Sequence, residues 1–418
     1  MATKLIPLCV LLLCAAIAGC GGGGTGETAN AGANAPASAT PPAGTPVAAS
    51  TPVNPPVQQS TVPNQQPVTV TATPGLARNM LTTSVTVCEP GTGHCATIDD
   101  IQVDTGSEGL RLLASALPAD MTLPALPSAT GTVGQCAVFG TGYAWGAVRS
   151  ADVRMAGEIA AALPIHIIAD ASVPTVPADC GSAGLALMTA GALHGNGILG
   201  VGLFAADCGA GCANTALPRW YYTCASDGTC TSTAQPIASQ VTNPVSRFAF
   251  DNNGVVIDLP AVPDTGSPSV SGSLIFGIGT QANNSLDGAT VLKANSSTGY
   301  VTTTIDGKPY TQSFFDSGSN GLFFTSSTLQ VCGLWYCPTS TQTSVATIKG
   351  TDGTTTTQSF MVGNAQTLFA TSNFAFNNLA GTAGNMFDWG LPFFFGRKVF
   401  TAIDSRATPA GPGPYYAF

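Results

Sequence analysis

Charged residues are scarce in this chain. Only 8% of its 418 residues are Asp, Glu, Lys or Arg, against roughly 25% in an average soluble domain. Because long helices need charged side chains on their solvated faces, this predicts few, short helices and favours an extracytoplasmic, β-rich protein. No run of Lys or Arg occurs and the formal charge is −9. We therefore expect no nucleic-acid partner, because a polyanion needs a basic surface.

The residue patterns that hold zinc are also absent. The chain has three histidines, which are widely spaced: His94, His166 and His194. Its cysteines never occur as Cys-x-x-Cys pairs, whereas structural zinc sites use such pairs or combine them with His. We therefore expect no metal and no cofactor.

The N-terminus has an apolar stretch from Leu5 to Ala18 that is too short to span a bilayer and is typical of a signal peptide, here residues 1–19. The stretch ends in Ile-Ala-Gly-Cys, which resembles the lipobox of bacterial lipoproteins and implies acylation of Cys20. The alternative is an ordinary signal peptide with a Cys near its cleavage site. Gly21 stands where an Asp would be expected for retention at the inner membrane of a Gram-negative cell. We expect a protein anchored by lipid in the bacterial envelope, at the periplasmic or the surface face of the outer membrane.

The remaining sequence divides by composition. Residues 20–75 are mostly Gly, Ala, Thr and Pro, with almost no large apolar side chain, which predicts a flexible, disordered tether. From residue 76 on, short apolar runs alternate with turn signals such as Asp-Asn-Asn-Gly at 251–254. This pattern predicts hairpins and a mostly antiparallel β protein. We divide it into an N-terminal part, 76–260, and a C-terminal part, 261–418.

The chain has thirteen cysteines. Two lie in the signal peptide and Cys20 is the acylation site, so ten remain, an even number as expected in an oxidising compartment. Four pairs are close in sequence and two cysteines are left over. The predicted disulfides are Cys88–Cys95, Cys208–Cys212, Cys224–Cys230, Cys332–Cys337 and Cys136–Cys180.

An acidic motif occurs twice. Asp-Thr-Gly-Ser-Glu-Gly-Leu begins at Asp104, and Asp-Ser-Gly-Ser-Asn-Gly-Leu begins at Asp316. Each motif is followed further along by two apolar residues and a glycine, at 198–200 and at 394–396. The same order in both halves of the chain predicts a duplicated lobe.

This order resembles the pepsin-like aspartic proteases, a bilobal, mostly β fold in which each lobe supplies one catalytic Asp. The segment 139–157 is similar to the flap hairpin of that family, and 415–418 to the short strand that closes its second lobe. The resemblance covers roughly residues 78–418 and extends to a little-characterised family of bacterial lipoproteins with this fold. It implies an aspartic endopeptidase that holds a peptide or protein substrate in the cleft between its lobes. The implied site residues are the catalytic Asp104 and Asp316, the supporting Thr105, Gly106, Ser107, Ser317, Gly318 and Ser319, and the flap residues Phe139, Gly140, Thr141 and Gly142.

Two carboxyl groups that share one proton can hydrolyse an amide, because one acts as general base on water while the other donates to the carbonyl oxygen. The hydroxyls of Thr105 and Ser317 can bond to the opposite loop, and those of Ser107 and Ser319 to the carboxylates. Such donors favour a charged carboxylate, so we expect low pKa values and activity that peaks below neutrality. A third Asp-Thr-Gly-Ser, at Asp264, is flanked by prolines, and we interpret it as a surface turn.

The chain departs from the family pattern in two places. Phe139 stands where the flap normally presents a Tyr, although Tyr143 and Trp145 are close by in sequence. Arg397 and Lys398 follow the second apolar-apolar-Gly segment, where the family usually has an acidic residue. A second hypothesis is therefore a non-catalytic surface lipoprotein that uses the same fold to bind a partner. We expect a monomer.

Replacing Cys20 with Ser should release the protein from the membrane fraction, because the acyl chains supply the free energy of anchoring. Cell fractionation followed by immunoblotting measures this. Cys14→Ser, which changes a cysteine inside the signal peptide, is the matched control and should stay membrane-bound. A Cys20→Ser protein that remains in the membrane fraction contradicts the lipobox interpretation.

Overall fold

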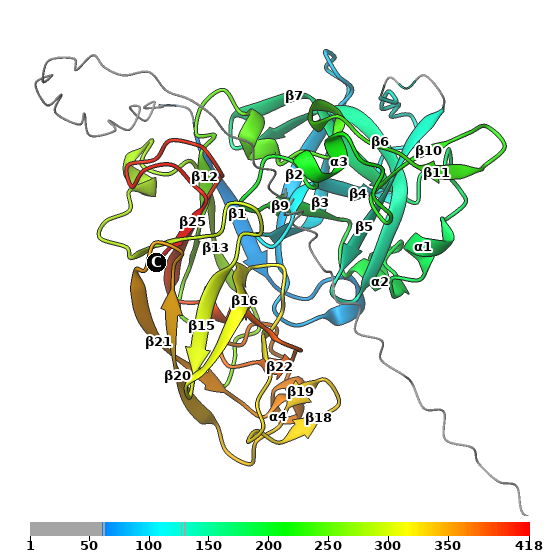
Figure 1. The fold of residues 1–418 in the computed structure, drawn as a ribbon. Helices are drawn as coiled ribbons and strands as arrows, with labels where there is room; N and C mark the ends of the chain where they lie inside the picture. The colour runs from blue at the N-terminus through cyan, green and yellow to red at the C-terminus, as the bar shows by residue number, and fades with distance from the viewer. Residues whose placement is uncertain (1–60, 62, 127, 129–130) are drawn as a thin grey trace, which may run out of the picture. The chain divides into compact units, whose positions relative to one another are not determined.

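The computed structural model describes residues 61, 63–126, 128 and 131–418, and this part of the chain is mostly β (Figure 1). The predicted signal peptide, Cys20 and most of the predicted tether lie outside the described residues. The helices of the described part are short, as the scarcity of charge predicts, and none of them has the length and apolar character needed to cross a membrane. They are α1 (Ala178–Gly181), α2 (Ala190–Leu193), α3 (Ala210–Ala213), α4 (Ala365–Phe369), and the 3-10 turns η1 (Pro74–Leu76), η2 (Ala114–Ala116), η3 (Ile237–Ser239), η4 (Pro244–Arg247), η5 (Ala282–Asn284) and η6 (Leu391–Phe393).

The strands of the described residues form two sheets, one of sixteen strands and one of nine. The larger sheet contains β1 (Gln65–Val70), β2 (Leu81–Cys88), β3 (Cys95–Asp104), β4 (Glu108–Leu113), β5 (Thr132–Phe139), β6 (Gly142–Met155), β7 (Glu158–Ile168), β8 (Leu185–Ala186), β9 (Gly197–Val201), β10 (Tyr221–Cys224), β11 (Cys230–Ser232), β12 (Gly254–Leu259), β13 (Val270–Phe276), β14 (Val291–Lys293), β24 (Arg397–Ala402) and β25 (Tyr415–Ala417). The smaller sheet contains β15 (Val301–Ile305), β16 (Lys308–Asp316), β17 (Leu322–Phe324), β18 (Val331–Cys332), β19 (Trp335–Tyr336), β20 (Gln342–Lys349), β21 (Thr355–Val362), β22 (Ala380–Thr382) and β23 (Met386–Gly390).

One stretch of the larger sheet joins segments that are far apart in sequence, in the order β1-β13-β12-β24-β25-β14. The hairpin formed by β12 and β13 crosses the boundary that we placed between residues 260 and 261. The C-terminal strands β24 and β25 also return to this sheet and pair with β12 and β14. The boundary therefore falls inside one sheet rather than between the two sheets.

The predicted tether extends too far, because β1 lies inside it. β1 pairs with β13 along its whole length and with β2 at Thr69 and Val70. Val68 and Val70 are buried while Pro67 and Thr69 are exposed, which is the alternation of a half-buried strand. The strand could not be recognised from the composition of residues 20–75, because its buried face consists of only two valines.

The same arrangement of three strands surrounds each acidic motif. β3, which ends at Asp104, pairs in parallel with β9, and β9 pairs antiparallel with β4. β16, which ends at Asp316, pairs in parallel with β23, and β23 pairs antiparallel with β17. The register places Gly200 beside Asp104 and Gly390 beside Asp316. The internal repeat of the sequence is thus a repeat of local topology.

This register corrects one prediction: the counterpart of residues 198–200 is 388–390, not 394–396. Both glycines are required by close approach of the backbone. A Cβ on Gly200 would lie 2.6 Å from the carbonyl carbon of Glu108, and one on Gly390 would lie 2.7 Å from the carbonyl oxygen of Ser319. The segment 394–396 instead follows η6 and leads into β24. The sequence pattern selected residues 394–396 because Asp388 stands where an apolar residue is expected in the segment that ends at Gly390.

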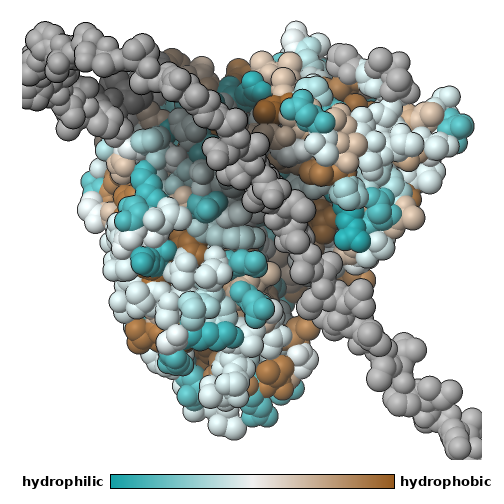
Figure 2. Space-filling view, in the orientation of Figure 1, coloured by the Kyte–Doolittle hydropathy of each residue, from teal (hydrophilic) through white to brown (hydrophobic). Residues whose placement is uncertain are grey.

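Covalent links and aromatic packing support the strands. All five predicted disulfides are present, which confirms them. Phe315, directly before Asp316, is completely buried. Its ring contacts the rings of Trp389, Phe393, Tyr416 and Phe418 at centroid distances of 4.9–6.0 Å. On the face shown in Figure 2, strongly hydrophilic residues are scattered among residues of intermediate hydropathy, in keeping with the low charge content.

A protein that begins at residue 76 should melt at a lower temperature than one that begins at residue 61. Removing β1 deletes two buried valines, each contributing about 1.5–3 kcal/mol, and leaves hydrogen-bonding groups of β13 without partners. Thermal denaturation followed by circular dichroism compares the two proteins. Equal melting temperatures contradict the assignment of β1 to the folded part.

Candidate active site

The two acidic loops bind each other through reciprocal hydrogen bonds. The Thr105 hydroxyl donates to the carbonyl oxygen of Phe315 at 3.0 Å and accepts the backbone N–H of Ser317 at 3.0 Å. The Ser317 hydroxyl donates to the carbonyl oxygen of Val103 at 2.8 Å and accepts the backbone N–H of Thr105 at 3.2 Å. Thr105 and Ser317 are both buried. These bonds fix the separation of two loops that lie 212 residues apart in the chain.

A fifth bond between the loops was not found from the sequence. The buried Gln102 side chain donates to the carbonyl oxygen of Gly318 at 2.6 Å. Gln102 lies in β3, two residues before Asp104, and no matching glutamine precedes Asp316. The repeat therefore gave no signal for it.

Each carboxylate is held by its own loop in the same way. Asp104 accepts the backbone N–H of Gly106 at 2.8 Å and the hydroxyl of Ser107 at 2.5 Å. In the second loop, Asp316 accepts the backbone N–H of Gly318 at 2.7 Å and the hydroxyl of Ser319 at 2.8 Å. These donors orient both carboxyl groups.

The two carboxyl groups meet across the loop pair. A Cβ on Gly106 would lie 2.5 Å from Cγ of Asp316, and a Cβ on Gly318 would lie 2.7 Å from Cγ of Asp104. Each loop can approach the other carboxyl this closely only because its third residue is glycine. Gly106 is exposed and Asp104 is 7% exposed, so the loops border on solvent.

The pKa of Asp316 is shifted upward, contrary to the low value expected from the hydroxyl donors. Desolvation and the neighbouring Asp104 carboxylate raise the pKa of Asp316 well above its ordinary value, and the bond from Ser319 offsets this only in part. An upward shift of this kind favours a single proton held by the pair to higher pH. The donors are visible in the sequence, but the approach of a second carboxylate is not, because Asp104 lies 212 residues away in the chain.

Two further acids near the pair were missed. Glu108 accepts the backbone N–H of Phe204 at 3.3 Å, and desolvation, together with the nearby Asp104, raises the pKa of Glu108 to about 8. Asp388 is 5% exposed, and burial raises its pKa well above the usual range. The sequence carried a signal for Asp388, an acid flanked by Phe387 and Trp389 in a chain poor in charge, but none for Glu108, which lies between Ser107 and Gly109.

The predicted flap residues form the turn of a hairpin. β5 and β6 pair up to Phe139 and Gly142, with Gly140 and Thr141 exposed at the turn. The Phe139 ring lies 5.8 Å from the guanidinium of Arg111. The Arg111 guanidinium in turn donates to the carbonyl oxygen of Glu108 at 2.6 Å, and Glu108 directly follows the first acidic loop. A chain of contacts thus links the turn to that loop.

The nearby aromatic residues do not supply the missing hydroxyl at the turn. Tyr143 and Trp145 are buried, in a cluster with the Cys136–Cys180 disulfide. The indole N–H of Trp145 donates to the carbonyl oxygen of Val173 at 2.8 Å. The turn therefore presents a phenyl ring without a hydroxyl.

Other candidate residues lie elsewhere. Asp264 is in an exposed turn, where its carboxylate accepts a bond from Asn377 at 3.1 Å. No group of three or more His, Cys, Asp or Glu within the described ranges is arranged to hold a metal.

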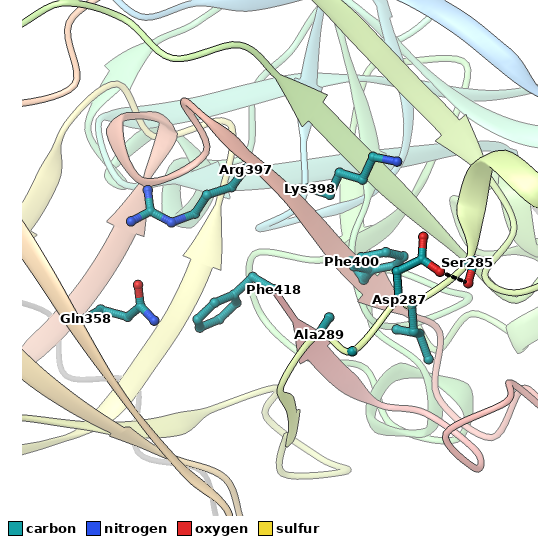
Figure 3. A pocket seen from close by; sticks show the side chains of 10 residues that line it. Ser285, Asp287, Ala289, Gln358, Arg397, Lys398, Phe400 and Phe418 are labelled. Atoms are coloured by element: carbon teal, nitrogen blue, oxygen red, sulfur yellow. Dashed lines mark hydrogen bonds between the residues drawn. The ribbon is translucent and has the colours of Figure 1, made fainter.

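A separate cavity of about 420 Å³ is lined by Arg397 and Lys398 (Figure 3). Because the segment beside Asp316 ends at Gly390, these two cations do not follow it, and the departure expected from the sequence does not apply to them. Their side chains extend to different sides of the cavity, Arg397 toward Gln358. The Lys398 ammonium lies 3.8 Å from the carboxylate of Asp258. None of the site residues predicted from the sequence lines this cavity.

Two carboxyl groups that lie close together between duplicated loops define a candidate acid–base site. The chain belongs to the family described as "Protein of unknown function (DUF3443)", whose model matches residues 60–418. Among solved structures it is similar to the aspartic proteinase from Irpex lacteus, with 16% sequence identity and a TM-score of 0.49, over 84% of this chain and 96% of that chain. A comparison with curated proteins found no match.

Replacing Thr105 with Val should lower the free energy of unfolding. Valine fills a similar volume but leaves the Phe315 carbonyl and the Ser317 N–H unpaired in a buried position, at about 1–3 kcal/mol for each unpaired group. Chemical denaturation measures the loss. Thr86→Val is the control, because the Thr86 hydroxyl bonds Thr97 on an exposed face. Equal losses in the two variants would show that the bonds between the loops add no stability.

Proposed function

We propose that this chain is an aspartic endopeptidase with the bilobal, pepsin-like fold. The observation that carries the proposal is the reciprocal bonding of the Thr105 and Ser317 loops, which brings the carboxyl groups of Asp104 and Asp316 together. The substrate is a peptide segment in an extended conformation, bound in the cleft between the lobes beneath the turn at 139–142. An acylated Cys20 holds the enzyme, as a monomer, at the outer membrane of a bacterial envelope, with its site on the periplasmic or the surface face.

In this proposal the raised pKa of Asp316 assigns the two roles. Asp316, whose pKa is raised, is protonated in the working form, and Asp104 carries the negative charge. Asp104 accepts a proton from a bound water, the water oxygen attacks the peptide carbonyl carbon, and Asp316 donates its proton to the carbonyl oxygen. The tetrahedral intermediate then collapses: Asp104 donates its proton to the nitrogen, Asp316 takes back the hydroxyl proton, and the C–N bond breaks. The pair ends in its starting state.

A second candidate function rests on the turn of the flap. Phe139 has no hydroxyl to donate toward a bound substrate, and Tyr143 and Trp145 are buried away from the turn. These features favour a non-catalytic surface lipoprotein that binds an extended peptide without cleaving it. Two acids held in the geometry of a proton-sharing pair favour the peptidase.

Either single change, Asp104→Asn or Asp316→Asn, should lower peptide cleavage by at least about 10²–10⁴-fold, because an amide can serve neither as base nor as acid. Cleavage of a peptide library by the protein of residues 61–418 measures this, with and without a statine-type inhibitor. Asp264→Asn is the matched control and should keep full activity, because Asp264 lies in a separate exposed turn.

Full cleavage by both single variants overturns the proposal. If the wild-type protein cleaves no peptide from acidic to neutral pH but binds extended peptides saturably, the second candidate function is correct instead.

A further inference from the structure

The outer end of the β5–β6 hairpin, which carries the turn at 139–142, projects beyond the strands on either side of it. On one side, β5 pairs with β10 only as far as Gln135. On the other side, β6 begins to pair with β7 at Gly146. Residues 137–144 lie beyond both of these ladders. Because a two-stranded hairpin is only marginally stable in water by itself, the turn needs another support.

Residues 180–187, which we call the brace, hold this end of the hairpin by both of its arms. The disulfide between Cys136 and Cys180 joins the brace to β5, close to Phe139 in the turn. Both cysteines are buried, at 1% and 0% exposure. Near the other end of the brace, β8 pairs in parallel with the first residues of β6. The turn therefore lies between two points of attachment.

The hydrogen bonds between the brace and β6 reach the turn itself. The N–H of Leu185 donates to the carbonyl oxygen of Thr141 at 3.3 Å, and the N–H of Leu187 donates to that of Tyr143 at 2.8 Å. This approach requires a glycine, because a Cβ on Gly142 would overlap the carbonyl oxygen of Leu185 and lie 2.8 Å from its carbonyl carbon. The Leu185 side chain is 70% exposed. The backbone, rather than this side chain, makes the attachment.

The disulfide of the brace differs from the other four disulfides of the described residues. Those four join cysteines that are 4–7 residues apart and close local loops. Cys136 and Cys180 are 44 residues apart. A link that spans a longer loop restricts the chain more. This disulfide therefore fixes a distant segment against the hairpin.

The brace is itself anchored to the larger sheet through α1. The carboxylate of Asp179, next to Cys180, accepts the hydroxyl of Tyr222 at 2.6 Å and the backbone N–H of Arg219 at 3.1 Å. The Arg219 guanidinium donates to the carbonyl oxygen of Asp179 at 2.9 Å. Tyr222 lies in β10, which pairs with the part of β5 that stays within the sheet. The position of the turn is thus tied to the sheet by a route outside the hairpin.

We propose that the brace is a positioning element of the site, which sets where the turn at 139–142 stands relative to the first acidic loop. The turn reaches that loop through Phe139, whose ring lies 5.8 Å from the Arg111 guanidinium, and through the bond from Arg111 to the carbonyl oxygen of Glu108. A turn free to swing would make this contact only part of the time. The inference rests on the proposed peptidase function and extends it to residues that do not touch the reacting atoms.

The first test needs no catalysis. In Gly142→Ala the new methyl group has to displace β8, while the disulfide stays intact. The segment 182–188 should then exchange its amide hydrogens about tenfold faster, because its bonds to β6 open more often. Hydrogen exchange of the protein of residues 61–418, followed by mass spectrometry, measures this.

Gly140→Ala is the matched control for hydrogen exchange, because a Cβ on Gly140 would meet no atom within 4 Å. Its exchange in the segment 182–188 should equal that of the wild type. Equal exchange in Gly142→Ala and Gly140→Ala contradicts the attachment of the brace to the turn.

The second test is cleavage of the library peptide that the wild type cleaves best. Cys136→Ala/Cys180→Ala removes the covalent attachment and leaves no free thiol. KM should rise about tenfold while kcat stays near the wild-type value, because the substrate binds only the fraction of molecules whose turn is in place. The pH profile of kcat should not change, because the two acids are untouched. A general loosening of the site would instead lower kcat and change the profile.

Cys224→Ala/Cys230→Ala is the matched control for the loss of a disulfide. These two cysteines pack in the same buried cluster as Cys136 and Cys180, but they join β10 to β11 and do not reach the turn. This variant should keep the wild-type KM. Circular dichroism shows whether each variant is folded. If Cys136→Ala/Cys180→Ala does not fold, Gly142→Ala, which keeps the disulfide, should raise KM in the same way.

The outcomes for the two proposals are separable. A wild type that cleaves peptides, with a KM that neither Gly142→Ala nor Cys136→Ala/Cys180→Ala raises, overturns the role of the brace and leaves the peptidase standing. A wild type without cleavage removes the peptidase, and the dissociation constant of a statine-type inhibitor then replaces KM. A constant that rises in both variants supports the brace, and an unchanged constant overturns it.

Discussion

The hydrogen bonds exchanged by Thr105 and Ser317 are the constraint on which the site depends. Two acids in desolvated surroundings repel one another once both ionise, and they would move apart if their loops were free. The two hydroxyls prevent this, because each bonds the backbone on either side of the opposite Asp. The glycines that follow let each loop rest against the other carboxyl. The loops thereby hold the two carboxyl groups close enough for the proton sharing that we propose.

The duplicated loops are alike in their hydrogen bonds and differ in their surroundings. Val103 precedes the first acid, whereas Phe315 precedes the second and is surrounded by aromatic rings. Asp388 replaces an apolar residue only on the second side. Desolvation and the nearby carboxyls of Asp104 and Asp388 raise the pKa of Asp316. The surroundings of the two loops therefore differ although their motifs are alike.

The sequence was informative where neighbouring residues decide the structure. The repeated motif located both loops, the cysteine spacing located the disulfides, and the low charge content indicated short helices. It was misleading at two places. Asp388 breaks the apolar pattern of the segment that ends at Gly390, so that segment was not recognised. The strand β1 was missed because Val68 and Val70 lie in a region with few apolar residues. The pKa of Asp316 lay beyond reach for another reason, because desolvation and the distance to a second acid exist only in the folded chain.

The central claim is that Asp104 and Asp316 act as one proton-sharing pair on a peptide. A crystal structure of the protein of residues 61–418 with a bound statine-type inhibitor tests this most directly, because the statine hydroxyl mimics the tetrahedral intermediate. The account predicts that this hydroxyl lies between the two carboxyl groups, within hydrogen-bonding distance of both, with the inhibitor backbone extended beneath the turn at 139–142. An inhibitor bound away from the two carboxyl groups, or carboxyl groups too far apart to share the hydroxyl, would contradict it.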